Sequence, residues 1–141
     1  MRKGETAMFI GVNHIGLVVQ DIDKWSEFLA KAFGAEEVAR IDLPDRGQCS
    51  CIMALDGKNV FELMAPIGEG GVVGKYLKTR GEGIHHISLK TNDLDADEAR
   101  LTEAGVTVFG KADVEGQMIA FTHPKTSMGV LFELAEFKND K

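Results

Sequence analysis

The chain has 141 residues, of which 44% are hydrophobic, and its formal net charge is −6. This length predicts one domain, and the acidic balance argues against nucleic acid as a partner, because nucleic acid needs a basic face. No apolar run is long enough to span a bilayer and no segment has the pattern of a signal peptide, so we expect no membrane partner. The two cysteines, Cys49 and Cys51, are two positions apart, and on a strand their Cα atoms would be roughly 6.5–7 Å apart, at the far limit of disulfide geometry, which favours reduced thiols and a cytoplasmic location.

The first half of the chain predicts a strand, a helix and three further strands. In "VNHIGLVV", residues 12–19, both faces of the strand are apolar, and His14 lies among them. Asp21 or Asp23 can cap the helix that follows, and Gly34 can end it. The helix has an apolar face formed by Ile22, Trp25, Phe28, Leu29 and Phe33, which we expect in the core. Strand patterns follow at 35–43, 48–56 and 59–66, with a hairpin at 56–59.

A helix-like segment at 70–80 leads to a second copy of this pattern. The strand "HHISLK" begins at His85, and Asp93 or Asp95 can cap the next helix. The second helix has a weaker apolar stripe, formed by Leu94, Leu101 and Ala104, and strand patterns follow at 105–110, 116–123 and 129–137. His86 lies 72 residues after His14, and Glu133 lies 71 residues after Glu62. Each half therefore predicts the order βαβββ.

Four ionisable residues occupy equivalent strand positions in the two halves. Imidazoles at His14 and His86 and carboxylates at Glu62 and Glu133 stand within apolar runs, where a polar group is costly without a partner. Two imidazoles and two carboxylates suit a divalent ion such as Zn²⁺, Co²⁺, Mn²⁺, Ni²⁺ or Fe²⁺ and leave positions for water or substrate. A single such histidine is more often a hydrogen-bonded core residue, and a single such glutamate more often lies at a sheet edge. The repeat favours the shared metal site.

Two other histidines are expected outside this ligand set. His85 matches Asn13 in the repeat and faces the opposite side of its strand from His86, so we predict that it is not a ligand. His123 belongs to an "HPK" turn and is expected to be structural or near the substrate.

Several stretches carry a resemblance to a known family: "NHIGLVVQDID", "FELMAP", "RGEGIHHISLK" and "FTHPKTSMGVLFEL". The doubled unit resembles the vicinal oxygen chelate superfamily, and within it the methylmalonyl-CoA epimerase family. The resemblance implies an α+β fold in which two βαβββ modules form a half-open β-barrel, the glyoxalase-like fold. It also implies a single domain over 1–141, with module one at about 9–66, a linker helix at about 70–80 and module two at about 83–137.

The resemblance implies an activity as well. The family interconverts (R)- and (S)-methylmalonyl-CoA by 1,1-proton transfer through a metal-stabilised enolate, and the resemblance also leads us to expect a homodimer. Its metal ligands fall on His14, Glu62, His86 and Glu133, with Co²⁺ as the expected ion and Mn²⁺, Ni²⁺, Zn²⁺ or Mg²⁺ as alternatives. Glu133 is also expected to serve in acid–base catalysis. The family's second acid–base glutamate falls on Asp45, which is one methylene shorter.

Other interpretations remain open on the sequence alone. Lys125, Thr126 and Ser127 are candidates to position an anionic part of the acyl-CoA substrate, and a solvated turn is the alternative. Asp45 has a similar alternative, since "PDRG" is a turn sequence in its own right. The competing functions are a metal-dependent glyoxalase I-like lyase or isomerase, a metal-free protein that binds small molecules, and an Fe²⁺ oxygenase, which needs only two histidines and one carboxylate.

Overall fold

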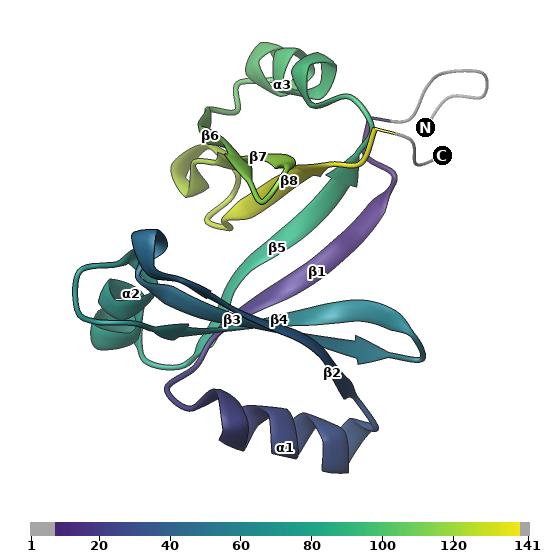
Figure 1. Ribbon diagram of the computed structural model, residues 1–141. Coiled ribbons are helices and arrows are strands. Elements are labelled where there is room, and N and C mark those ends of the chain that lie inside the picture. The colour runs from purple at the N-terminus through teal and green to yellow at the C-terminus, as the bar shows by residue number, and fades with distance from the viewer. Residues whose placement is uncertain (1–7, 139–141) are drawn as a thin grey trace. The chain divides into compact units, whose positions relative to one another are not determined.

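The computed structural model describes residues 8–138, which form eight β-strands and three α-helices (Figure 1). These residues form two compact units: residues 14–85, and residues 8–13 together with 86–138. That the two units make a single domain over 1–141 stays a prediction. No helix within the described residues is long and apolar enough to cross a membrane.

The first module has the predicted order of elements and is followed by the predicted linker helix. Its strands lie in the order β2-β3-β4-β1, and the first strand pairs in parallel with the last. The hairpin between β3 and β4 turns at Asp56 and Gly57, as predicted. The bounds are β1 Gly11–Val18, α1 Ile22–Phe33, β2 Glu36–Leu43, β3 Gln48–Leu55, β4 Lys58–Pro66 and the linker helix α2 Val72–Arg80.

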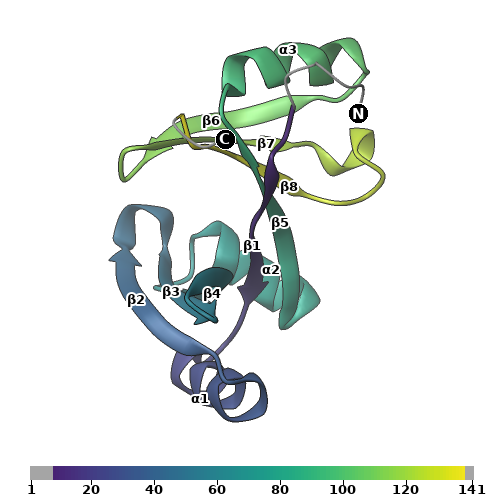
Figure 2. The ribbon, with the colours of Figure 1, turned by 90° about the vertical axis from the view of Figure 1, so that its right-hand side faces the viewer.

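The second module repeats this arrangement. Its strands lie in the order β6-β7-β8-β5, so the first and last strands are again parallel neighbours. Figure 2 shows α3 running along β6. The bounds are β5 Gly83–Thr91, α3 Leu94–Glu103, β6 Val108–Val114, β7 Gln117–Thr122 and β8 Phe132–Glu136. The predicted α+β class with two βαβββ modules is confirmed.

Helix α1 covers one face of the first module. The Asp21 carboxylate caps it by accepting a hydrogen bond from the Lys24 N–H at 3.1 Å, and the helix ends at Gly34. Ile22 and Leu29 are buried against alternate residues of the strands, among them Leu17, Cys51, Leu63 and Ala65. One side of β1, β3 and β4 is therefore closed by the helix.

The predicted apolar face of α1 is wrong in part. Trp25 packs against the core, but Phe28 is 52% exposed and Phe33 is 62% exposed. Phe28 is displaced around the helix axis from the stripe of Ile22 and Leu29, and Phe33 is the last helical residue. The three aromatic rings instead stack edge-on along the helix, from Trp25 through Phe28 to Phe33.

Helix α2 lies against the other face of the same strands. Val73 packs with Val18 and Met64, which point away from α1 because neighbouring residues of a strand face opposite sides. The expectation that β1 is covered on both faces is confirmed for its second half, where Leu17 and Val18 are buried, but Val12 near its start is 62% exposed. A polar residue on the α2 side of β1 or β4 is thus partly shielded from water.

Helix α3 closes the corresponding face of the second module. Asp93 caps it by accepting from the Ala96 N–H at 3.1 Å, and Leu94 is buried against Ala120 and Leu134. Buried Asp97 accepts a hydrogen bond from the Thr91 hydroxyl, and burial raises the pKa of its carboxyl.

Two details of the second module differ from prediction. Ala104 is exposed at the end of α3 and does not belong to its apolar stripe. Strand β6 begins later than expected, at Val108, and continues through Lys111 and Asp113, whose polar side chains conceal the strand pattern.

We predict that Leu29→Ala lowers the free energy of unfolding by about 2–5 kcal/mol, because Leu29 is 3% exposed and its loss leaves a cavity. Phe28→Ala, one residue away on the same helix, should cost about 1 kcal/mol or less, since half of its side chain is already in water. Urea unfolding of both variants measures the difference. Equal losses would contradict this description of α1.

Candidate functional site

His14 and Glu62 form a close pair on the first module. Strands β1 and β4 are parallel with Gly16 opposite Glu62, which places His14 two residues earlier on the same face. The Nε2 atom of His14 lies 3.1 Å from a carboxylate oxygen of Glu62, and the side chains are 15% and 17% exposed. The pair lies on the face away from α1.

His86 and Glu133 occupy the equivalent positions on the second module. Strand β5 is parallel to β8 with Ser88 opposite Glu133, so His86 again lies two residues before the residue that faces the glutamate. His86 is 4% exposed and Glu133 is 8% exposed. Phe121 of β7 also lies opposite Glu133, and its ring packs edge-on against the His86 imidazole. The two modules therefore repeat one register as well as one pair of residue types.

The His14–Glu62 geometry fits a metal centre. Two ligands about 2.0–2.2 Å from one ion and nearly at right angles are about 3 Å apart. The observed 3.1 Å between imidazole nitrogen and carboxylate oxygen agrees with this separation. Nitrogen and oxygen donors of these types suit first-row divalent ions. The residues present thus fit the ion that the sequence predicts.

His85 points elsewhere, as predicted. Its ring meets the ring of Tyr76 on α2 edge-on, with the centroids 4.9 Å apart, and the Tyr76 hydroxyl donates to the Ile84 carbonyl at 2.7 Å. These contacts give His85 a packing role at the beginning of β5.

Asp45 lies in an exposed 3₁₀ turn, Pro44–Arg46, between β2 and β3. The turn is closed by a backbone hydrogen bond from the Gly47 N–H to the Pro44 carbonyl at 3.0 Å. Among residues 8–138, the closure of this turn does not use the Asp45 carboxylate. Gly47 also touches the backbone of Gly71, just before α2, so closely that a side chain at Gly71 would meet the Arg46 carbonyl at 2.6 Å. The loop that carries Asp45 is therefore fixed against the start of α2.

The turn after β7 uses most of its polar side chains for its own structure. The Thr126 hydroxyl donates to the His123 carbonyl and accepts from the Thr107 N–H, while the Ser127 hydroxyl donates to the Val130 carbonyl at 2.8 Å. His123 caps the turn by accepting from the Lys125 N–H. The structural role expected for His123 is present, and the Lys125 side chain is the most exposed of the three substrate-binding candidates.

Three buried polar residues were missed by sequence reasoning. Two lie on the face that carries Glu62, and one lies on the face that carries His86. Gln48 and Ser50 are 6% and 2% exposed and joined by a 2.9 Å hydrogen bond, and the register of β3 with β4 places them on the Glu62 face. Ser88 is fully buried and lies two residues after His86 on the same face of β5. It accepts a hydrogen bond from Asn13. Polar residues at alternate positions of apolar strands are the signal that could have found them.

The cysteines lie on the opposite face. Cys51 packs in the core beneath α1, and burial raises the pKa of its thiol to about 11; burial also raises the pKa of Cys49. Both lie on the α1 side of the strands, away from the His14–Glu62 pair.

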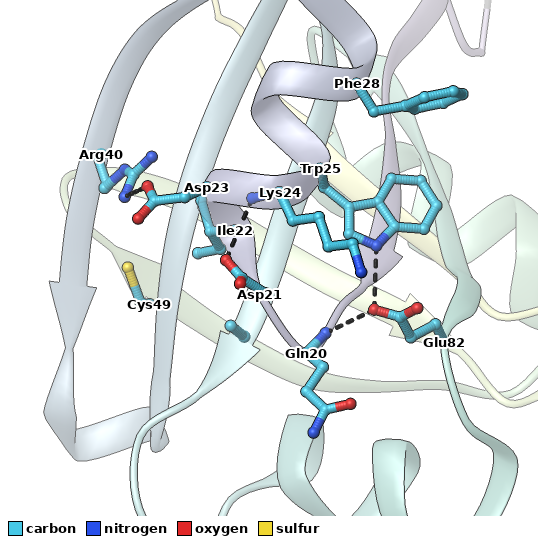
Figure 3. A pocket seen from close by; sticks show the side chains of 11 residues that line it. Gln20, Asp21, Ile22, Asp23, Lys24, Trp25, Phe28, Arg40, Cys49 and Glu82 are labelled. Atoms are coloured by element: carbon cyan, nitrogen blue, oxygen red, sulfur yellow. Dashed lines mark hydrogen bonds and ion pairs between the residues drawn. The ribbon is translucent and has the colours of Figure 1, made fainter.

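A cavity of about 910 Å³ opens within residues 14–85, beside the start of α1 (Figure 3). Cys49 and Ala65 in its wall belong to the α1-facing side of the strands, so the cavity is not on the Glu62 face. Of its two cationic side chains, Arg40 is already bound by Asp23 and Glu37, which raises the pKa of the guanidinium. The Arg40 side chain is therefore already engaged by carboxylates of this chain.

Comparisons with known proteins agree with the two-module architecture. The family model described as Glyoxalase/Bleomycin resistance protein/Dioxygenase superfamily matches residues 13–121. The ethylmalonyl-CoA/methylmalonyl-CoA epimerase of Cereibacter sphaeroides is 35% identical over an alignment of 130 residues, which covers 89% of this chain and 96% of that protein.

Solved structures show the same likeness. The crystal structure of methylmalonyl-CoA epimerase from Mycobacterium tuberculosis is 33% identical, with a TM-score of 0.85 over 94% of this chain and 91% of that one. A methylmalonyl-CoA epimerase in complex with methylmalonyl-CoA and NH₄⁺ is 32% identical, with a TM-score of 0.82 over 94% of this chain and 97% of that one. By its sequence and by its paired modules, the chain belongs to the Glyoxalase/Bleomycin resistance protein/Dioxygenase superfamily.

Proposed function

We propose that this protein is an epimerase that interconverts (R)- and (S)-methylmalonyl-CoA by 1,1-proton transfer. The observation that carries the proposal is similarity over nearly the whole chain to epimerases of this substrate, one of which holds methylmalonyl-CoA in its structure. The name of the Cereibacter sphaeroides protein adds ethylmalonyl-CoA as a second acyl group to test. A glyoxalase I-like reaction uses the same ligand types, but these relatives are named as epimerases.

The direct test is incubation of one epimer of methylmalonyl-CoA with the protein in D₂O. Epimerisation should bring deuterium to C2 and produce the other epimer, and ethylmalonyl-CoA should be run in parallel. Recovery of the starting epimer with no deuterium at C2 would reject the proposed function.

We infer that His14, Glu62, His86 and Glu133 together hold one divalent ion, with Co²⁺ as the expected metal and Mn²⁺, Ni²⁺, Zn²⁺ or Mg²⁺ as alternatives. By donor type, His14, Glu62 and His86 could hold such an ion. The equivalent register of His86 and Glu133 supports a ligand contribution from each module. When bound, the ion would act as a Lewis acid that stabilises negative charge developing on the substrate oxygens.

Epimerisation needs one carboxylate to remove the C2 proton and a second carboxyl group to return a proton to the opposite face. We propose Glu133 and Asp45 for these two roles. The electron pair of the broken C–H bond delocalises into the thioester carbonyl, and the second group reverses this as it gives up its proton. An Asp45 carboxylate that does not close its own turn is suited to such work. Thr126 and Ser127 support their turn, so among the three candidates Lys125 is the one we propose to meet an anionic part of the acyl-CoA.

We also propose a homodimer, on the basis of the family resemblance, and sedimentation velocity at micromolar concentration tests it. A cytoplasmic location stays a prediction.

We predict that His86→Ala loses most of its bound metal, because the loss of an imidazole ligand removes one of four strong donors. Elemental analysis after dialysis against a mild chelator measures the metal per chain. His123→Ala is the matched control, since that histidine caps a turn, and it should keep its metal. A His86→Ala protein with the full metal content would rule out the proposed ligand set.

We predict that Asp45→Asn abolishes epimerisation while deuterium still exchanges into at least one epimer. An amide cannot take the C2 proton, and loss of a general acid or base typically costs about 10²–10⁴-fold in rate. Glu133 would still exchange the proton on its own face without inverting the centre. Chiral analysis combined with mass spectrometry in D₂O separates the two events.

Asp56→Asn is the control for this experiment, because Asp56 lies in an exposed hairpin turn that accepts asparagine. It should epimerise like the wild type. If folded, metal-replete Asp45→Asn does so too, Asp45 has only the turn role.

A further inference from the structure

The segment "RGEGIHH" holds a glutamate between two glycines, immediately before β5 begins. Gly81 has φ +76° and Gly83 has φ +156°, conformations that residues with side chains rarely adopt. Neither glycine would meet another atom within 4 Å if it carried a Cβ. The Gly81 N–H donates to the Leu77 carbonyl at 2.9 Å, which connects the segment to α2.

The Glu82 carboxylate connects the same segment to the start of α1. One of its oxygens accepts two hydrogen bonds, from the Gln20 backbone N–H at 2.8 Å and from the Trp25 indole N–H at 3.0 Å (Figure 3). Gln20 is the second residue after β1, and Trp25 lies in the first turns of α1. Glu82 thus ties the beginning of β5 to the turn that joins β1 and α1, and all of these residues lie in the unit 14–85.

A second contact holds the same point from the other side. Tyr76 of α2 donates to the Ile84 carbonyl and packs against His85, so the first residues of β5 are held by α2 as well as by Glu82. Glu82 accepts the hydrogen bonds that connect this segment to the β1–α1 turn and to α1. His86 is the fourth residue of β5 and follows Glu82 by four positions in the sequence.

We propose that Glu82 is a positioning residue for the metal site. By fixing the start of β5 it limits the freedom of the strand that carries His86, and a ligand held in place binds an ion more tightly than one that must be ordered on binding. This inference rests on the proposed function only through the ligand role of His86. Glu82 does not itself touch the ion or the substrate.

The test measures the Kd of the protein for Co²⁺ by calorimetry, below the unfolding transition of each variant as located by urea titration. Glu82→Ala should raise the Kd about five- to tenfold, in line with the loss of two hydrogen bonds to a charged group that is partly exposed. Glu82→Gln keeps an accepting oxygen and should restore the Kd to within about threefold of wild type. Glu27→Ala, which removes an exposed carboxylate of α1, should leave the Kd unchanged.

Trp25 gives an independent readout, because it is the only tryptophan in the sequence. Glu82→Ala should shift its fluorescence emission. Trp25→Phe removes the indole N–H and should raise the Kd about two- to threefold in the wild type, but it should have no further effect in Glu82→Ala, since the partner is already absent.

The outcomes separate this inference from the metal site itself. A wild-type protein that binds neither Co²⁺ nor Mn²⁺, Ni²⁺, Zn²⁺ or Mg²⁺ overturns both. If the wild type binds Co²⁺ and folded Glu82→Ala binds it equally tightly, only the role of Glu82 is overturned. The same conclusion follows if Glu82→Ala weakens binding and Glu82→Gln does not restore it.

Discussion

The parallel pairing of the first and last strand in each module is the constraint on which the rest of the structure depends. It places a glutamate opposite the residue that lies two positions after a histidine, once at Gly16 and Glu62 and again at Ser88 and Glu133. A slip of one residue would turn either glutamate to the opposite face of its sheet. The apolar residues that alternate with these positions on the strands pack against α1 or α3. The same slip would turn them away from those helices, so their burial favours the observed register.

These histidines and glutamates have a cost that the rest of each module must offset. Ionisable groups in partly desolvated positions disfavour folding unless they are paired or bind an ion. In the first module, apolar burial on both sides of the sheet offsets that cost. One core is closed by α1 and the other by Val73 of α2. The His14 and Glu62 side chains are 15% and 17% exposed, so little water competes for their charges and any electrostatic interaction made there is stronger.

Much of this arrangement could be predicted because it depends on local sequence patterns. Strand alternation, Asp caps and the spacing from His14 to His86 each depend on residues near one another in sequence or on a simple repeat. The failures have a different origin. The exposure of Phe28 depends on which part of α1 the sheet covers, and the partners of Glu82 lie 57 and 62 residues away in the chain. The Gln48–Ser50 pair was missed for a similar reason, since burial of two polar residues becomes evident only when β4 and its face are in place.

Strands β2 and β6 end the strand order of their modules, and within the described residues each pairs with one other strand. An open strand edge can pair with another chain, which leads to aggregation. Both edges carry charged side chains: Arg40 of β2 bonds to Glu37 and to Asp23 of α1, and Lys111 of β6 bonds to Asp95 and Glu98 of α3. The ion pairs that add little to folding stability at the surface thus place charge where a foreign strand would have to dock, and they keep partly unfolded chains from joining edge to edge.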